Sequence, residues 1–363
     1  MISTTIDKNL IVPPGDTVKE IIDYKQMPQK ELATRLGVSA KHINEIIKGK
    51  AFISIELANK LELVLGMPAH FWINLDTAYQ EELAAYEEEQ RLLELSIELD
   101  NFPIKDMIKK GWIEASKNVL YQTKLLLQFF EVASFDNLRE LMQSSRESVG
   151  LYKIDDRFTI DDYALKVWLR KGEIEAEKIE TSPFNRTELI NMLPELRDIT
   201  NITDPNEFIP LLQNKLATVG VAVVLVPEIK NCRASGVARW LSKDKCIVQL
   251  SVRYKQNDRL WFAFFHEIGH ILHHAKKDIY LESVDIDKTK EIELEADEFA
   301  ANTMISRESM KFFDTHPISL NSITEFSKSQ KIHPGIVVGR LQHENKLSYQ
   351  TALNHLKISY SWK

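Results

Sequence analysis

The sequence predicts an α+β protein that is mostly helical, with a five-helix N-terminal domain, a helical connector, and a C-terminal domain built from a small β-sheet and a long helix. Short amphipathic helical patterns follow one another over residues 16–76, whereas β-branched runs gather near residues 219–252. A long apolar helical pattern directly follows these runs. We place the domain limits at 1–78, 79–200 and 201–310, with 311–363 as a helical extension of the third domain.

Composition narrows the class of protein. Of 363 residues, 44% are hydrophobic and 27% are charged, which excludes a disordered or fibrous chain. The net charge of −7 gives no global attraction to nucleic acid, so any such surface must be local. Two cysteines are too few for a disulfide framework, and neither a signal pattern nor an apolar run of membrane-spanning length is evident. These observations predict a cytoplasmic protein without a membrane partner.

Helix start and stop signals divide residues 16–76. Thr17 and Glu20 form a capping box for the first helix, and Ser54 begins the fourth. Gly37 separates the second helix from the third, which Ser39 can cap. Short helices with a glycine-containing turn between the second and third indicate a helix-turn-helix.

Residues 25–50 carry a local net charge of +4 in an otherwise acidic chain. In a helix-turn-helix the second helix enters the major groove with its N-terminus first, so Lys41 is expected to read guanine and Asn44 adenine. Ser39 and Ala40 would also face base edges, and Gln29 and Lys48 would lie near phosphates. The alternative is a small helical protein-interaction domain with a solvated basic face.

An acidic helix is predicted over residues 77–99. Residues 81–100 contain eight acidic residues and one arginine, and apolar or neutral positions recur at heptad spacing: Tyr79, Leu83, Tyr86, Gln90, Leu93 and Ile97. About three repeats are compatible with a homodimer seam or with a helix that lies on its own domain. Residues 103–200 read as a helical connector without recognisable chemistry.

The strongest chemical pattern is His266-Glu267-Ile268-Gly269-His270. Two histidines at i and i+4 project from one helix face, so both imidazoles can reach one zinc ion. Glu267 stands where a carboxylate can accept the proton of a water molecule held by the metal. The apolar helix around the motif argues against coincidence, although a buried helix with two incidental histidines is the alternative.

A catalytic zinc site needs a third protein ligand. In one class of zinc site, a third histidine farther along the chain is the ligand, and this class requires glycine at position 273 and histidine at position 276. This chain has His273 and Lys276 there, so that class is excluded. A carboxylate from the following helix, expected over residues 291–305, is the alternative. We favour Glu293, with Asp297 orienting a ligand histidine, and keep Glu295 as the rival.

Other residues near the motif suggest supporting roles. The strand over 245–252 is a candidate edge for an extended peptide substrate, although a central strand would read alike. Cys232 is a candidate redox switch whose thiolate would occupy the open metal position, against the simpler interpretation of a loop cysteine. Tyr254 and Arg259 are weak candidates for stabilising an oxyanion, and His274 for closing the helix.

These residues resemble two known families. QKELATRLGVSAKHINEIIKGK, within residues 13–76, resembles an XRE-type helix-turn-helix of the HigA antitoxin kind. Residues 163–345 are similar to the ImmA/IrrE metallopeptidase family in WLRKGE, VPEIKNCRASGVARWLS, DRLWFAFFHEIGHILHH, ELEADEFAA and PGIVVGRLQHE. The second resemblance implies a zincin-like domain with Zn²⁺ on His266, His270 and Glu293, and catalysis by Glu267.

The resemblances also imply partners. Members of the peptidase family cleave helix-turn-helix repressors, and HigA-type proteins bind their own promoter and often a toxin. We therefore expect a DNA-binding regulator with a zinc-dependent endopeptidase domain, acting on operator DNA and on a repressor, an antitoxin-like protein or a toxin. The alternative is a HigA-like transcription factor whose metal domain senses or binds partners without proteolysis.

Overall fold

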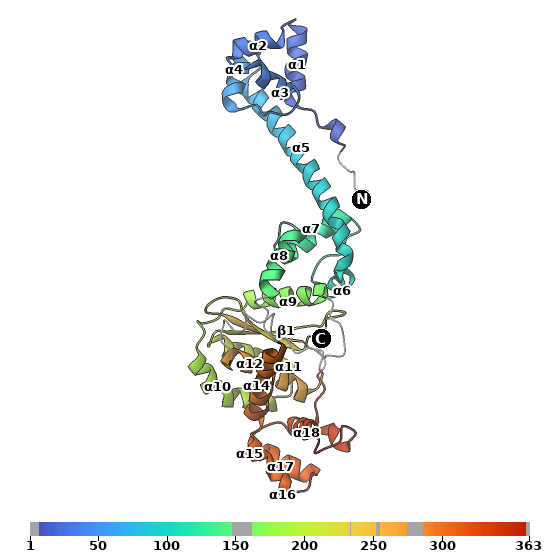
Figure 1. Ribbon diagram of the computed structural model, residues 1–363, viewed down its shortest axis with the longest axis vertical. Helices are drawn as coiled ribbons and strands as arrows, with labels where there is room; N and C mark the ends of the chain where they lie inside the picture. Colours follow the sequence, from blue (N-terminus) through green and yellow to red (C-terminus); the bar gives the residue numbers. More distant parts are fainter. Residues whose placement is uncertain (1–6, 147–161, 233, 252–254, 274–285, 361–363) are drawn as a thin grey trace. The chain divides into compact units, whose positions relative to one another are not determined.

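The structure is a computed structural model that describes residues 7–146, 162–232, 234–251, 255–273 and 286–360 (Figure 1). Contacts between residues divide the chain into two compact units. The first unit comprises Met1–Leu99 with Ala115–Leu126, and the second comprises Asp100–Glu114 with Leu127–Lys363.

The first unit contains the five N-terminal helices predicted from the sequence, so that part of the fold class is confirmed. Its core consists of leucine, isoleucine and valine side chains around the fully buried Trp72. The helices are α1 (Pro14–Tyr24), α2 (Gln29–Leu36), α3 (Ala40–Ile47), α4 (Ile55–Leu65) and α5 (Ala69–Leu95), preceded by the 3₁₀ turn η1 (Lys8–Leu10).

Local chemistry explains most of these boundaries. Gly37 ends α2 in the left-handed region at φ 67°, which favours glycine, and the Ser39 hydroxyl accepts a hydrogen bond from the His42 amide to start α3. The capping box predicted at Thr17 and Glu20 is wrong. The helix α1 begins at Pro14, whose missing amide hydrogen costs nothing in the first turn.

The acidic helix predicted to begin at residue 77 begins instead at Ala69 as part of α5. Its first half lies on its own domain, since the buried Asp76 accepts a hydrogen bond from the Ile53 amide at 2.9 Å. Farther along, Lys8 lies over the Tyr86 ring at 5.8 Å, while Leu93 is 47% and Ile97 80% exposed. The first half of the helix therefore packs on its own domain, as one of the two interpretations expected, and the homodimer stays a prediction.

Helices also form the chain between α5 and the sheet, a stretch that includes Ala115–Leu126 of the first unit. After η2 (Ser96–Asn101) come α6 (Ile104–Lys109), α7 (Val119–Phe130), α8 (Phe135–Arg146), α9 (Asp162–Glu177), α10 (Arg186–Asp198), η3 (Ile199–Asn201) and α11 (Pro205–Ala217). An aromatic cluster packs the residue before α6 against α7, α8 and α9, because the Phe102 ring lies 4.7 to 5.7 Å from the rings of Tyr163, Phe135 and Phe130.

A three-stranded sheet follows, formed by β1 (Val221–Val226), β2 (Gly236–Trp240) and β3 (Cys246–Ser251). The order is β1-β3-β2, with β1 parallel and β2 antiparallel to β3. The sheet lies between α9 and α12 (Asn257–His273) (Figure 1). The expectation that residues 245–252 offer a free edge is wrong, because β3 is the central strand and both of its edges are paired. A run buried on both faces hides this distinction from the sequence.

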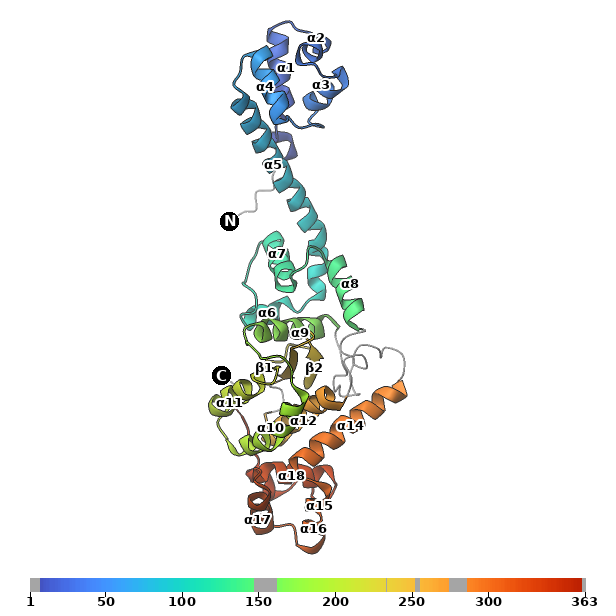
Figure 2. The same cartoon turned by 90° about the vertical axis from the view of Figure 1, so that its left-hand side faces the viewer.

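The chain continues through α14 (Ile286–Met304), which runs alongside α12 (Figure 2). The expected short C-terminal helices are α15 (Arg307–Met310), α16 (Phe312–Thr315), α17 (Leu320–Gln330), α18 (Pro334–His343) and η4 (Ala352–Leu356). The final segment returns to α12, where the Asn257 side chain accepts a hydrogen bond from the Ile358 amide at 3.1 Å. Among the described helices, none has the length and apolar character needed to cross a membrane.

Candidate metal centre

Helix α12 carries the histidine pair through the centre of the second unit. Its apolar residues Leu260, Phe264 and Ile268 are buried in the same core as the strands, which fixes the rotation of the helix. His266 and His270 are consequently only 1% and 4% exposed. The Arg186 guanidinium donates to the Leu272 carbonyl oxygen at 3.0 and 3.1 Å and so satisfies a terminal carbonyl of α12, a role that the sequence did not reveal.

The antiparallel packing of α14 brings Glu293 to both imidazoles. One carboxylate oxygen lies 3.3 Å from Nε2 of His266 and the other lies 3.3 Å from Nε2 of His270. The two Nε2 atoms are themselves 3.0 Å apart. Zinc bonds of about 2.0–2.1 Å in a tetrahedron separate neighbouring ligand atoms by roughly 3.3 Å. The three donors therefore fit a zinc ion in nature and in spacing.

Asp297 holds the first histidine from the far side of its ring. Its Oδ1 lies 2.8 Å from Nδ1 of His266, an arrangement in which Nδ1–H donates and the Nε2 lone pair points at the metal position. Asp297 follows Glu293 by one helical turn, so one face of α14 supplies both carboxylates.

The pKa values of this metal-free cluster are strongly shifted. Burial lowers the pKa of His266, but the hydrogen bonds to Asp297 and Glu293 outweigh it and raise this pKa to about 9. Burial likewise opposes ionisation of Glu293, yet the hydrogen bonds from His266 and His270 hold its pKa well below the usual range of a carboxyl group. Without metal, the cluster is a buried imidazolium and carboxylate pair.

Glu267 is 1% exposed and lies against the beginning of β2. A Cβ atom added to Gly236 would lie 2.7 Å from Glu267 Oε1 and 3.0 Å from its Cγ, so only glycine permits this approach. Sequence reasoning missed Gly236, although a glycine at the start of an otherwise β-branched run was a detectable sign of close backbone approach. The packing of β2 against α12 thus places the start of the strand beside the Glu267 carboxylate.

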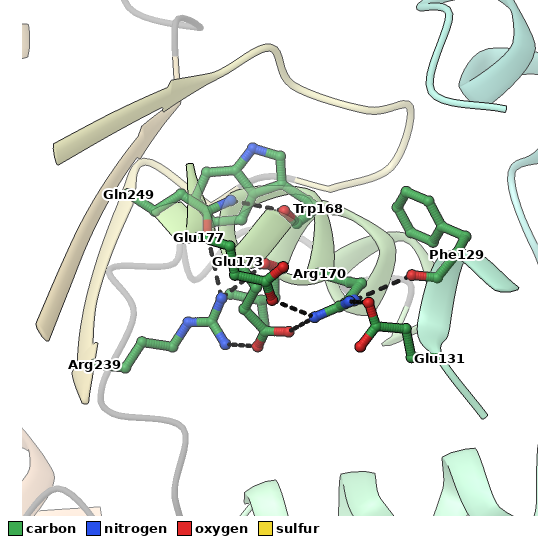
Figure 3. Close-up of polar contacts among 9 residues, drawn as sticks. Phe129, Glu131, Trp168, Arg170, Glu173, Glu177, Arg239 and Gln249 are labelled. Carbon is green, nitrogen blue, oxygen red and sulfur yellow. Dashed lines mark hydrogen bonds and ion pairs between the residues drawn. The ribbon is translucent and has the colours of Figure 1, made fainter. Parts of the chain in front are cut away.

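A polar network fastens β2 to α9 on the other face of the sheet (Figure 3). The Arg239 guanidinium donates to Glu173 and, at 2.7 Å, to the Leu169 carbonyl oxygen. Arg170 pairs with the far oxygen of Glu173 at 3.0 Å and with Glu131 at 2.7 Å. Gln249 of β3 donates to the Trp168 carbonyl oxygen at 2.7 Å. The buried arginine of β2 is therefore held by several acceptors, which fixes the strand.

The remaining residues predicted near the metal lie elsewhere. Glu295 is exposed and does not join the three converging donors. Cys232, 3% exposed, lies in the loop before β2, and it is not part of the donor cluster either. Arg259 is exposed on α12. Tyr254 and His274 lie outside the described residues.

The residues predicted to contact DNA lie on α2 and α3 of the first unit. Ser39, Ala40 and Lys41 occupy the exposed start of α3, and Lys48 follows its end. Lys41 keeps 84% of its side chain exposed although Glu45 lies 3.7 Å away. Gln29 and Asn44 are half-buried. The structure brings these positions to one helix pair, and their contacts with DNA stay predictions.

Comparison with known proteins identifies both units. Residues 18–72 match the helix-turn-helix family model, and residues 239–355 match the model of the IrrE N-terminal-like domain, a peptidase family. Over 66 residues, 18% of this chain and 70% of the relative, the sequence is 30% identical to the uncharacterised HTH-type transcriptional regulator YddM of Escherichia coli. The crystal structure of a candidate antidote protein of a plasmid maintenance system from Nostoc punctiforme is 26% identical, with a TM-score of 0.22, and the match covers 23% of this chain and 91% of that one.

Proposed function

Because this chain belongs to the helix-turn-helix transcriptional regulators through its N-terminal unit and carries an IrrE-like peptidase domain, we propose that it is a regulator with zinc-dependent endopeptidase activity. The observation that carries the proposal is a pair of imidazole nitrogens 3.0 Å apart, each 3.3 Å from one oxygen of the same carboxylate, beside a buried glutamate. This site belongs to the HExxH class with a glutamate as third ligand.

His266, His270 and Glu293 would hold the metal, and Asp297 would orient His266. Zinc supplies Lewis-acid polarisation of a water molecule and of the peptide carbonyl group when it is bound. Glu267 accepts the proton of the attacking water and delivers it to the leaving amine. Burial of this carboxylate keeps bulk water away from the proton that it transfers.

The substrate is expected to lie along β2. In the described part of the chain, β2 pairs with β3 alone, so its second edge faces no strand. Gly236 brings this edge to Glu267, and main-chain hydrogen bonds could hold an extended peptide there. The proposed edge therefore replaces the strand that the sequence favoured. The protein substrate would be a repressor, an antitoxin-like protein or a toxin.

The test is mass spectrometry of the zinc-loaded full chain incubated with the proteins encoded beside it, with Glu267→Gln as the matched control. A discrete cut that only the intact protein makes supports the proposal. Stoichiometric zinc without any cut refutes the endopeptidase and favours the alternative, a HigA-like antitoxin or transcription factor whose metal domain senses or binds partners.

For the first unit, we propose that the start of α3 reads operator DNA, with Lys41 and Asn44 contacting bases and Lys48 a phosphate. Lys41→Ala should weaken binding to the promoter of this gene by about 5- to 150-fold at fixed salt. Lys48→Ala should reduce the salt dependence by about one phosphate contact. Lys19→Ala on α1, where the side chain is 52% exposed, is the matched control in fluorescence anisotropy. Equal losses from Lys19→Ala and Lys41→Ala would refute the assignment.

A further inference from the structure

A cavity of about 380 Å³ lies in the second unit beside the metal centre. Three helices and the returning C-terminal segment line it. Its apolar walls are Phe262, Ala263, Ala301, Met304, Ile305 and Ile336. The volume falls within the range of about 300–1,000 Å³ that is usual for ligand pockets.

The helix registers place this cavity one turn from the proposed metal. Phe262 and Ala263 precede His266 by four and three residues, so they project from the face of α12 that carries the imidazoles. The Phe262 and His266 ring centroids are 6.3 Å apart. On α14, Ala301 follows Asp297 by four residues and so continues the face that supplies the carboxylates. Ser235, which also lines the cavity, directly precedes the glycine that touches Glu267.

The buried charged groups of the lining each have a partner of opposite charge. Lys357 pairs with Asp258 at 2.6 Å, with side chains 6% and 10% exposed. Arg340 pairs with Glu344 at 2.6 Å. Arg259 and His343 are exposed and form the rim. The walls therefore offer apolar contact, and an ionised ligand group would lose hydration there without a vacant buried counter-charge.

The helix α18 and the segment that follows it form one wall of this cavity. A Cβ atom at Gly339 of α18 would lie 2.4 Å from Asp258 Oδ2, so the glycine lets α18 press against the start of α12. Lys357 then ties the returning segment to Asp258 and, at 2.7 Å, to Gln342. These contacts hold the wall in place independently of any ligand.

We propose that this cavity is the specificity pocket of the peptidase and takes the side chain of one large apolar residue, leucine, methionine or phenylalanine, that flanks the bond to be cleaved. The inference rests on the proposed endopeptidase function. Its basis is the position of the cavity beside both catalytic helix faces, together with walls that suit an uncharged side chain. A peptide held along β2 passes the pocket because Ser235, which lines the pocket, directly precedes the first residue of β2.

The first test is cleavage of a proteome-derived peptide library by the zinc-loaded full chain. We expect large apolar residues to be enriched at one position next to the cut. Ala301→Phe, which fills the cavity, should lower kcat/KM for a peptide with leucine at that position at least tenfold relative to the same peptide with alanine. Leu320→Phe, at a position 46% exposed on α17, is the control and should change neither value.

The second test measures binding without turnover in the Glu267→Gln protein. The probes are N-acetyl-leucinamide and N-acetyl-aspartamide, followed through the labelled methyl group of Met304 by NMR. The leucine probe should produce a saturable shift that Ala301→Phe abolishes, and the aspartate probe should not. Ala263→Phe serves as the second pocket variant if circular dichroism shows that Ala301→Phe does not fold.

The two tests separate the pocket from the peptidase. Cleavage without apolar preference, or a Met304 resonance that does not respond to the leucine probe, overturns the pocket and leaves the peptidase standing. A library that stays uncut by protein with stoichiometric zinc overturns the endopeptidase, and the specificity role of the cavity with it.

Discussion

Zinc affinity should depend steeply on pH because the metal must displace a proton from His266. In the metal-free protein the hydrogen bonds to Asp297 and Glu293 prevail over burial and raise the pKa of this imidazole to about 9. At pH 7 the ring is therefore protonated almost completely, whereas a zinc ligand must be neutral. The pKa lies two units above this pH, and each unit is worth about 1.36 kcal/mol. Binding at pH 7 is thus weaker by about 2.7 kcal/mol, or roughly hundredfold, than above pH 9.

The assay is a chelator competition between pH 6.5 and 9.5, combined with calorimetry in buffers of different ionisation enthalpy. We expect the apparent Kd to fall about tenfold per pH unit up to pH 8 and then to level off near pH 9, with about one proton released from His266 at pH 7. Asp297→Asn should lower the pKa of His266 and reduce the proton release. Above pH 9, where no proton competes with the metal, it should weaken zinc binding by about 10- to 100-fold. A Kd independent of pH between 7 and 9 would refute the reasoning.

The same shifts determine the stability of the metal-free protein. A raised pKa means that the folded state holds the proton of His266 more tightly than the unfolded state does. This stabilisation is fully present below about pH 6.5 and is lost as the pH rises through about 9. For Glu293 the pKa is lowered, so its contribution is present above the ordinary carboxyl pKa of 4.5 and is lost in acid. Both pKa shifts arise from the same interactions, so their contributions to the free energy of unfolding are not summed. Protein freed of metal by a chelator should require the highest urea concentration for unfolding between about pH 5 and 6.5.

Three further substitutions test how the site is built. Gly236→Ala would press a methyl group against Glu267, so we expect peptidase activity to fall with zinc content unchanged and stability to fall by about 1–3 kcal/mol; normal activity would show that the strand yields. Arg239→Met removes the partner that holds Glu173 and β2, and denaturant titration should show a loss of about 2–3 kcal/mol, against less than about 0.5 kcal/mol for the exposed Lys243→Met. Cys232→Ser should leave activity under reducing conditions unchanged, because the thiol is buried and is not among the converging metal donors; increased activity would instead support a thiolate switch.

The sequence by itself determined the local elements of this protein and the candidate residues of its metal site. The i, i+4 histidine pair, the acidic helix after it and the glycine turn before Ser39 are local patterns, and local geometry fixes what such patterns can form. A helix-turn-helix unit and a helix with two aligned imidazoles therefore followed from spacing alone. The five-helix unit and the small sheet with its motif helix are both present in the structure. Among the helix starts, the capping box was misplaced because Pro14 starts a helix as readily as a polar cap, and the acidic helix begins at Ala69 instead of residue 77.

Only the tertiary structure decided which distant residues meet. The sequence favoured Glu293 but left Glu295 as a rival, and the rotation of α14 against α12 brings the first to both imidazoles and leaves the second exposed. A run buried on both faces does not reveal the order of the strands, so the edge proposed for the peptide moved from β3 to β2. The pocket formed with α18 and the contact of Gly236 with Glu267 depend on long-range packing, which no local periodicity encodes.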